Sequence, residues 1–118
     1  MEPIQMTEKI VRTLDSKKAM DITAIKIEEL TTISDYFVIA SAGSTTQLKA
    51  LSDEVEYQLE KEGVVCGHRE GFESASWILL DYGSVIVHLF LKDSRAFYSL
   101  ERLWNDGVEV DITNWIEE

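Results

Sequence analysis

The sequence contains little cysteine and no long apolar run, and each shortage excludes a class of protein. Its 118 residues include one cysteine, Cys66, so no disulfide can form within the chain, which fits a reducing compartment. No apolar stretch approaches the roughly 18 residues that a membrane span needs. The first residues also lack the basic start and apolar run of a signal peptide. We therefore expect a cytoplasmic protein that does not bind membranes.

Positive charge is also scarce. Lys and Arg together number 11 against 22 Asp and Glu, which gives a net charge of −11. A protein of this charge is repelled by phosphate backbones, and its densest basic cluster is only Lys17 and Lys18 with Arg12 nearby. We expect no direct nucleic-acid binding. The acidity fits a basic protein partner, and it fits equally well a solvated acidic surface that aids solubility.

What the chain does contain is the balance of an ordered domain, since 45% of its residues are apolar and 28% are charged. Apolar residues at helical spacing predict a first helix over residues 6–14. β-Branched residues and alternation predict strands over residues 21–27 and 36–40. A second helix is expected to begin at Ser44, whose side chain can cap it, and to end at Gly63.

The second half of the chain reads as three more strands and a helix. A weakly marked strand over residues 64–69 precedes two strong apolar runs, residues 77–82 and 85–91. The two residues between these runs include a glycine, which predicts an antiparallel hairpin. A last helix is expected to start at Asp93 or Ser94 and to run to about Trp104.

These elements predict a single α/β domain with a mixed five-stranded sheet flanked by helices. Their order is helix, two strands, helix, three strands, helix, and we assign residues 1–105 to the domain and residues 106–118 to a C-terminal extension. Residues 108–112 of the extension alternate as a short strand would. We expect Trp115 and Ile116 to fold back onto the rest of the protein.

The hairpin defines two faces, because directly opposed residues on antiparallel strands share a face. If Gly83 and Ser84 form a two-residue turn, one face is almost wholly apolar and should belong to the core. It holds Ile78, Leu80, Tyr82, Val85, Val87 and Leu89. The other face mixes large apolar groups with two polar side chains: it holds Trp77, Leu79, Asp81, Ile86, His88 and Phe90.

This second face has two explanations. Aromatic anchors beside a few polar groups are typical of protein interfaces, so the face can be a docking surface. Alternatively, a helix covers it, with His88 and Asp81 simply hydrogen-bonded inside. Exposure would decide between the two, and the sequence does not give it.

Catalytic and metal chemistry find weak support. The strand that ends at Gly43 and the helix that starts at Ser44 resemble a phosphate-binding turn of nucleotidyltransferases, but plain helix capping is the better explanation. No paired carboxylates follow to hold two metal ions. Cys66 and His68 supply only two ligands of a zinc site, and no Ser or Cys is placed beside Asp81 and His88 as a nucleophile. We therefore expect neither an enzyme nor a cofactor or metal.

Four segments taken in order resemble the Iojap or ribosomal silencing factor family over about residues 4–105. They are residues 33–39 (ISDYFVI), 77–83 (WILLDYG), 87–90 (VHLF) and 95–104 (RAFYSLERLW). The resemblance implies a nucleotidyltransferase-like fold without catalysis. It also implies binding to ribosomal protein number fourteen of the large subunit, a block on joining of the small subunit that represses translation, and possible homodimers.

Carried onto matching positions, the resemblance implies partner contacts on the hairpin and around the last helix. These residues are Trp77, Asp81, His88, Arg95, Tyr98, Leu100 and Trp104. Ser84 departs from the family, which commonly has an acidic residue after the glycine. Two other hypotheses remain: a nucleotidyltransferase-like enzyme that uses the Gly43-Ser44 turn, and an acidic homodimeric adaptor.

Overall fold

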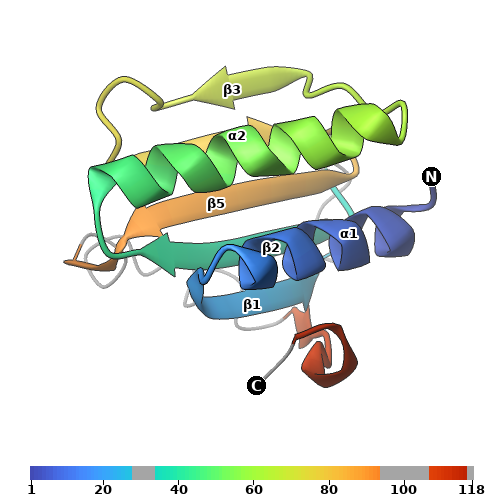
Figure 1. Ribbon diagram of the computed structural model, residues 1–118. Coiled ribbons are helices and arrows are strands. Elements are labelled where there is room, and N and C mark those ends of the chain that lie inside the picture. The colour runs from blue at the N-terminus through green and yellow to red at the C-terminus, as the bar shows by residue number, and fades with distance from the viewer. Residues whose placement is uncertain (28–33, 94–106, 117–118) are drawn as a thin grey trace.

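A computed structural model describes residues 1–27, 34–93 and 107–116, whose strands form one mixed sheet (Figure 1). The helices are α1 (Pro3–Ser16), α2 (Thr45–Lys61) and the short 3-10 helix η1 (Thr113–Trp115). The strands are β1 (Met20–Lys26), β2 (Tyr36–Ala42), β3 (His68–Glu70), β4 (Trp77–Asp81), β5 (Val85–Leu91) and β6 (Val108–Glu109). They lie in the order β3-β4-β5-β2-β1-β6, with β2 and β5 parallel and the other neighbours antiparallel. The predicted α/β domain with a mixed sheet is confirmed.

The predicted count of five strands is wrong, because the described residues alone contribute six strands to the sheet. The sixth strand, β6, comes from the C-terminal extension and pairs with the edge of β1, where Ile25 faces Glu109 and Lys26 faces Val108. Alternation in the extension indicated a strand. It carried no information on which sheet edge that strand would join, since pairing between distant segments depends on the whole fold.

The strand predicted over residues 64–69 is shorter and begins later than expected. Val64 donates its backbone N–H to the carbonyl of Leu59, 2.9 Å away, which closes the turn that follows α2. Gly67 donates to the carbonyl of Asp81, and only from His68 onward does the chain pair regularly with β4. Residues 64–67 therefore form the connection between α2 and β3, and they are not part of the strand.

Both long helices pack on the same face of the sheet (Figure 1). Each presents an apolar stripe to it, as the spacing predicted. The stripe of α1 is Met6, Ile10, Val11 and Leu14, and that of α2 is Leu48, Leu51, Val55 and Leu59. All eight side chains are buried against the inner faces of the strands, among them Val38, Leu80 and Val87. Burial of apolar surface stabilises a protein by about 25 cal/mol per Å². Because most of the buried apolar residues lie on this face, it contributes most of the hydrophobic stabilisation.

The C-terminal extension returns to the domain. Val110 donates a backbone hydrogen bond of 2.8 Å to the carbonyl of Ala24, which continues the edge of the sheet beyond β6. Trp115 and Ile116 then pack against the main core, as predicted. Arg12 of α1 lies 3.4 Å from the carbonyl of Asn114. Residues 107–116 thus complete the helix-covered side of the molecule, and the boundary assigned at residue 105 stays a prediction.

A second, smaller cluster lies on the opposite face of the sheet. It is formed by Ile25, Ile27, Phe37, Ile39 and Phe90, with Trp77 and Ile86 packed against it. Neither α1 nor α2 covers this face. This is the same face that carries the mixed apolar and polar side of the hairpin, with Trp77, Asp81 and His88.

Candidate functional site

The hairpin of β4 and β5 has the predicted register. Trp77 is opposite Phe90, Leu79 is opposite His88, and Asp81 is opposite Ile86. Tyr82 donates its backbone N–H to the carbonyl of Val85 at 3.0 Å, which closes the two-residue turn. The assignment of side chains to the two faces is therefore confirmed.

The turn is held in place by the segment that leads into β2. The carbonyl of Ser84 accepts backbone hydrogen bonds from Asp35 (2.8 Å) and Tyr36 (3.1 Å). The hydroxyl of Ser34, a buried residue, donates a third to the same oxygen at 2.9 Å. A carbonyl with three donors fixes the turn against the neighbouring strand. The hairpin side chains are thus presented by a rigid support.

Exposure differs between the middle and the margin of the second face. Trp77, Leu79, Asp81 and Ile86 are partly exposed. Phe90 is fully buried and only 4% of the surface of His88 is exposed. Of the two explanations that the sequence left open, the docking surface therefore fits the margin of this face and the covered arrangement fits its centre. β5 is a central strand, and rings from both neighbouring strands, those of Phe37 and Trp77, lie beside the imidazole of His88.

Three aromatic rings surround His88. The Phe37 ring on β2 lies 4.7 Å from the imidazole centroid, and the Trp77 and Phe90 rings lie 5.9 and 6.4 Å from it. Trp77 also stacks on Phe90 at 5.4 Å and an interplanar angle of 22°. Phe37 was missed by the sequence reasoning, because only the parallel pairing of β2 with β5 brings it to this face.

The imidazole of His88 is neutral at physiological pH. Burial lowers the pKa of His88 from 6.5 to about 4, since the charged form loses its hydration. The indole N–H of Trp77 donates to Nδ1 of His88 at 3.2 Å. Nδ1 is therefore the unprotonated nitrogen and Nε2 carries the hydrogen. Among the described residues, the buried Nε2 has no hydrogen-bond partner.

Asp81 occupies the end of the face, beside the turn. Its Oδ1 accepts a hydrogen bond of 2.8 Å from the backbone N–H of Gly83, which fixes the carboxylate. The partly exposed carboxylate can accept from a basic group on a partner. The other predicted contacts, Arg95, Tyr98, Leu100 and Trp104, and the helix predicted to carry them lie outside the described residues.

The turn before α2 acts as a helix cap. The Ser44 hydroxyl accepts from the backbone N–H of Gln47 at 3.1 Å, and the Gln47 side chain accepts from the N–H of Gly43 at 2.8 Å. This reciprocal pair is the predicted cap, and it occupies two of the amides that a phosphate would need. Within residues 1–27, 34–93 and 107–116, no three His, Cys, Asp or Glu side chains are grouped to hold a metal ion.

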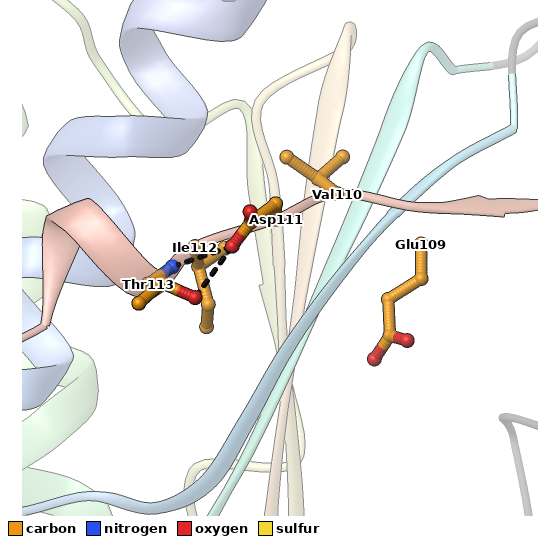
Figure 2. A pocket seen from close by; sticks show the side chains of 5 residues that line it. All are labelled: Glu109, Val110, Asp111, Ile112 and Thr113. Carbon is orange, nitrogen blue, oxygen red and sulfur yellow. Dashed lines mark hydrogen bonds between the residues drawn. The ribbon is translucent and has the colours of Figure 1, made fainter.

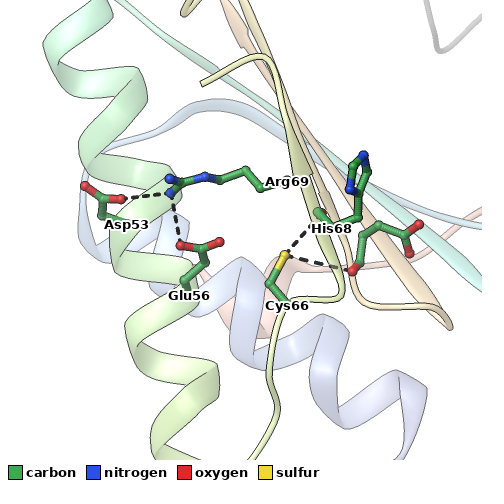
Figure 3. Close-up of polar contacts among 6 residues, drawn as sticks. Asp53, Glu56, Cys66, His68 and Arg69 are labelled. Atoms are coloured by element: carbon green, nitrogen blue, oxygen red, sulfur yellow. Dashed lines mark hydrogen bonds and ion pairs between the residues drawn. The ribbon is translucent and has the colours of Figure 1, made fainter. Parts of the chain in front are cut away.

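Cys66 and its neighbours form a polar cluster at the β3 edge (Figure 3). Arg69 lies 3.2 Å from Asp53 and 3.1 Å from Glu56, so it ties β3 to α2. The Cys66 thiol contacts the backbone carbonyl of His68 at 3.2 Å, and burial raises the pKa of Cys66. A raised pKa disfavours the reactive thiolate. The cluster therefore braces the sheet edge and offers no nucleophile.

A surface hollow of about 350 Å³ lies along the C-terminal extension between Glu109 and Thr113 (Figure 2). Its one internally bonded carboxylate is that of Asp111, which accepts from both the N–H and the hydroxyl of Thr113. These hydrogen bonds lower the pKa of Asp111. The hollow thus contains a local turn and carries no assembled group of catalytic side chains. None of the described helices is long and apolar enough to span a membrane.

Comparison with known proteins identifies the family to which this sequence is similar. A family model described as "Ribosomal silencing factor during starvation" matches residues 1–118. The ribosomal silencing factor RsfS of Bacillus subtilis is 40% identical over 98 residues, which is 83% of each chain. A solved structure from Chromobacterium violaceum is 33% identical with a TM-score of 0.87, covering 89% of this chain and 88% of its own. The mouse protein named "Mitochondrial assembly of ribosomal large subunit protein 1" is 34% identical over 101 residues, 80% of this chain and 43% of its own.

Proposed function

Because the chain belongs to the ribosomal silencing factor family, which includes the Iojap proteins, we propose that it binds the large ribosomal subunit and prevents the small subunit from joining. Its action is then steric and requires no catalysis. The name of the mouse relative, which refers to assembly of a large ribosomal subunit, supports the choice of partner. The cytoplasmic location expected from the sequence belongs to the same proposal.

One observation supports a particular docking surface: the sheet face opposite α1 and α2 bears the aromatic hairpin side chains (Figure 1). Trp77 and Asp81 are both partly exposed there, one as an apolar anchor and the other as an acceptor beside it. An aromatic anchor with a polar acceptor beside it is typical of protein interfaces. Arg95, Tyr98, Leu100 and Trp104 complete the proposed contact set on the strength of the resemblance.

The charge supports docking through a protein. At a net charge of −11 the chain is repelled by ribosomal RNA, whereas a basic ribosomal protein attracts it. We therefore place the contact on ribosomal protein number fourteen of the large subunit, as the resemblance implies. Homodimers, which the resemblance also implies, would compete with this contact if they used the same face.

Co-sedimentation with purified large subunits tests the proposal. The protein should pellet with large subunits and stay in the supernatant with small subunits. Purified ribosomal protein number fourteen, added in excess, should release it. A protein that stays in the supernatant with large subunits and sediments as a dimer in analytical ultracentrifugation would instead support the adaptor hypothesis.

A further inference from the structure

Trp77 has two ring partners that are more deeply buried than itself. Its indole stacks on Phe90, which is fully buried, and its N–H donates to His88, which is 4% exposed. Trp77 itself is partly exposed at the margin of the face. The partly exposed indole of Trp77 is thus held by two buried side chains, Phe90 and His88.

Phe90 and His88 determine different features of the indole's orientation. Stacking on Phe90 fixes the plane of the indole, but a ring turned over about its last side-chain torsion keeps most of that contact. The hydrogen bond to Nδ1 of His88, at 3.2 Å, exists in only one of these orientations. It therefore decides which edge of the Trp77 ring faces out of the molecule.

His88 is suited to this task because its own position and protonation are fixed. The Phe37 ring lies 4.7 Å away on the next strand, and Leu79 is opposite on β4. Burial keeps the imidazole neutral, with a pKa of about 4, so the lone pair on Nδ1 stays available at physiological pH. The described residues in ring contact with it are Phe37, Trp77 and Phe90, none of which carries a charge.

We propose that His88 is a positioning residue: it holds the Trp77 indole in the orientation that meets the partner and makes no contact with the partner itself. This inference rests on the proposed function, and it changes the role that the resemblance gave to His88. A direct contact would require an exposed imidazole, whereas the imidazole is buried and its Nδ1 accepts the hydrogen bond from the Trp77 indole.

A double-mutant cycle on binding to large subunits separates the two roles. His88→Phe keeps an aromatic ring but removes the acceptor, and Trp77→Phe removes the indole N–H. We expect His88→Phe alone to weaken binding roughly fivefold, in keeping with the loss of one hydrogen bond. In the Trp77→Phe background the same change should alter binding by less than about twofold. The matched control His68→Phe, at an exposed position, should leave binding unchanged.

The outcomes separate this inference from the proposed function. If the unmodified protein fails to bind large subunits, the proposed function is wrong. If it binds, and His88→Phe weakens binding equally with and without the Trp77 indole, His88 contacts the partner directly and the positioning role is wrong. Unchanged binding of the single variant also rejects it.

A measurement on the unmodified protein does not depend on how the variants fold. Long-range ¹H–¹⁵N correlation spectra distinguish the two neutral imidazole tautomers. The inference requires hydrogen on Nε2 of His88 and slow solvent exchange of the Trp77 indole N–H, becoming roughly five- to tenfold faster in His88→Phe. Hydrogen on Nδ1 would contradict it.

Discussion

The imidazole of His88 lies among the rings of Phe37, Trp77 and Phe90, and these surroundings decide its protonation. The hairpin rule placed His88 on the correct face from the sequence alone. Its burial was not predictable in the same way, because Phe37 reaches it through the pairing of β2 with β5, which brings together residues about fifty positions apart. The face on which a side chain lies follows from residues close in the chain. Its burial depends on the order of strands in the sheet.

Burial of a neutral histidine makes stability depend on pH. The pKa of His88 is lowered from 6.5 in the unfolded chain to about 4 in the folded one, so the unfolded state binds the extra proton first. Stability is complete above pH 6.5 and falls as the pH drops toward 4, by at most about 3 kcal/mol. Urea unfolding at several pH values measures this. His88→Phe should remove the slope between pH 6.5 and 5, and His68→Gln should keep it. A slope that survives in His88→Phe would assign it to another group.

Gly71 lies against the start of β4, where a side chain does not fit. Its φ is +81°, and an added Cβ would lie 2.0 Å from the carbonyl oxygen of Trp77. We expect Gly71→Ala to lower the free energy of unfolding by about 3 kcal/mol, from backbone strain and the clash together. Gly63 has nearly the same φ, +80°, with nothing within 4 Å of an added Cβ. Gly63→Ala should therefore cost about 1 kcal/mol, and equal losses in thermal unfolding would show that the clash is relieved.

Tyr98 enters the account through the family resemblance as an apolar anchor. Replacing it by Ala should weaken binding to large subunits by on the order of 2 kcal/mol with the fold intact. Tyr57, which is 58% exposed on α2, provides the matched control, and Tyr57→Ala should bind normally. Co-sedimentation at several protein concentrations, with circular dichroism of each variant, makes the comparison. Normal binding by Tyr98→Ala would remove this residue from the site.

At the scale of elements, strong local signals predicted the two long helices and the hairpin. The apolar stripes, the Ser44 cap and the glycine-containing turn each depend on residues close in the chain. The two edge strands were less predictable. β3 is only three residues long and all three are polar and exposed, so no apolar pattern marks it. β6 depends on pairing with a strand some eighty residues earlier.

The cap of α2 decides between two explanations of the Gly43-Ser44 turn. Ser44→Ala removes the acceptor for the Gln47 N–H and should cost about 1 kcal/mol of stability. Ser44→Asp keeps an acceptor and should stay within about 0.5 kcal/mol of the original protein. Neither variant should alter binding to large subunits. Loss of a nucleotide-dependent activity in Ser44→Asp, whose charge would repel phosphate, would instead favour the nucleotidyltransferase hypothesis.

At the scale of the whole molecule, the two faces of the sheet have separate tasks. The face under α1 and α2 holds the larger core, and the C-terminal extension adds Trp115 and Ile116 to it. The opposite face presents Trp77 and Asp81 on a hairpin whose turn is fixed by three hydrogen bonds to Ser84. A net charge of −11 over the whole chain opposes contact with RNA. Together these features suit a small factor that blocks a surface by occupying it.

Joining of purified ribosomal subunits, followed on sucrose gradients, tests whether the protein keeps the small subunit from the large one. The protein is added in excess over large subunits before small subunits are supplied. We expect the subunits to stay separate and the protein to migrate with the large subunit. Joined ribosomes at the level seen without the protein would contradict it.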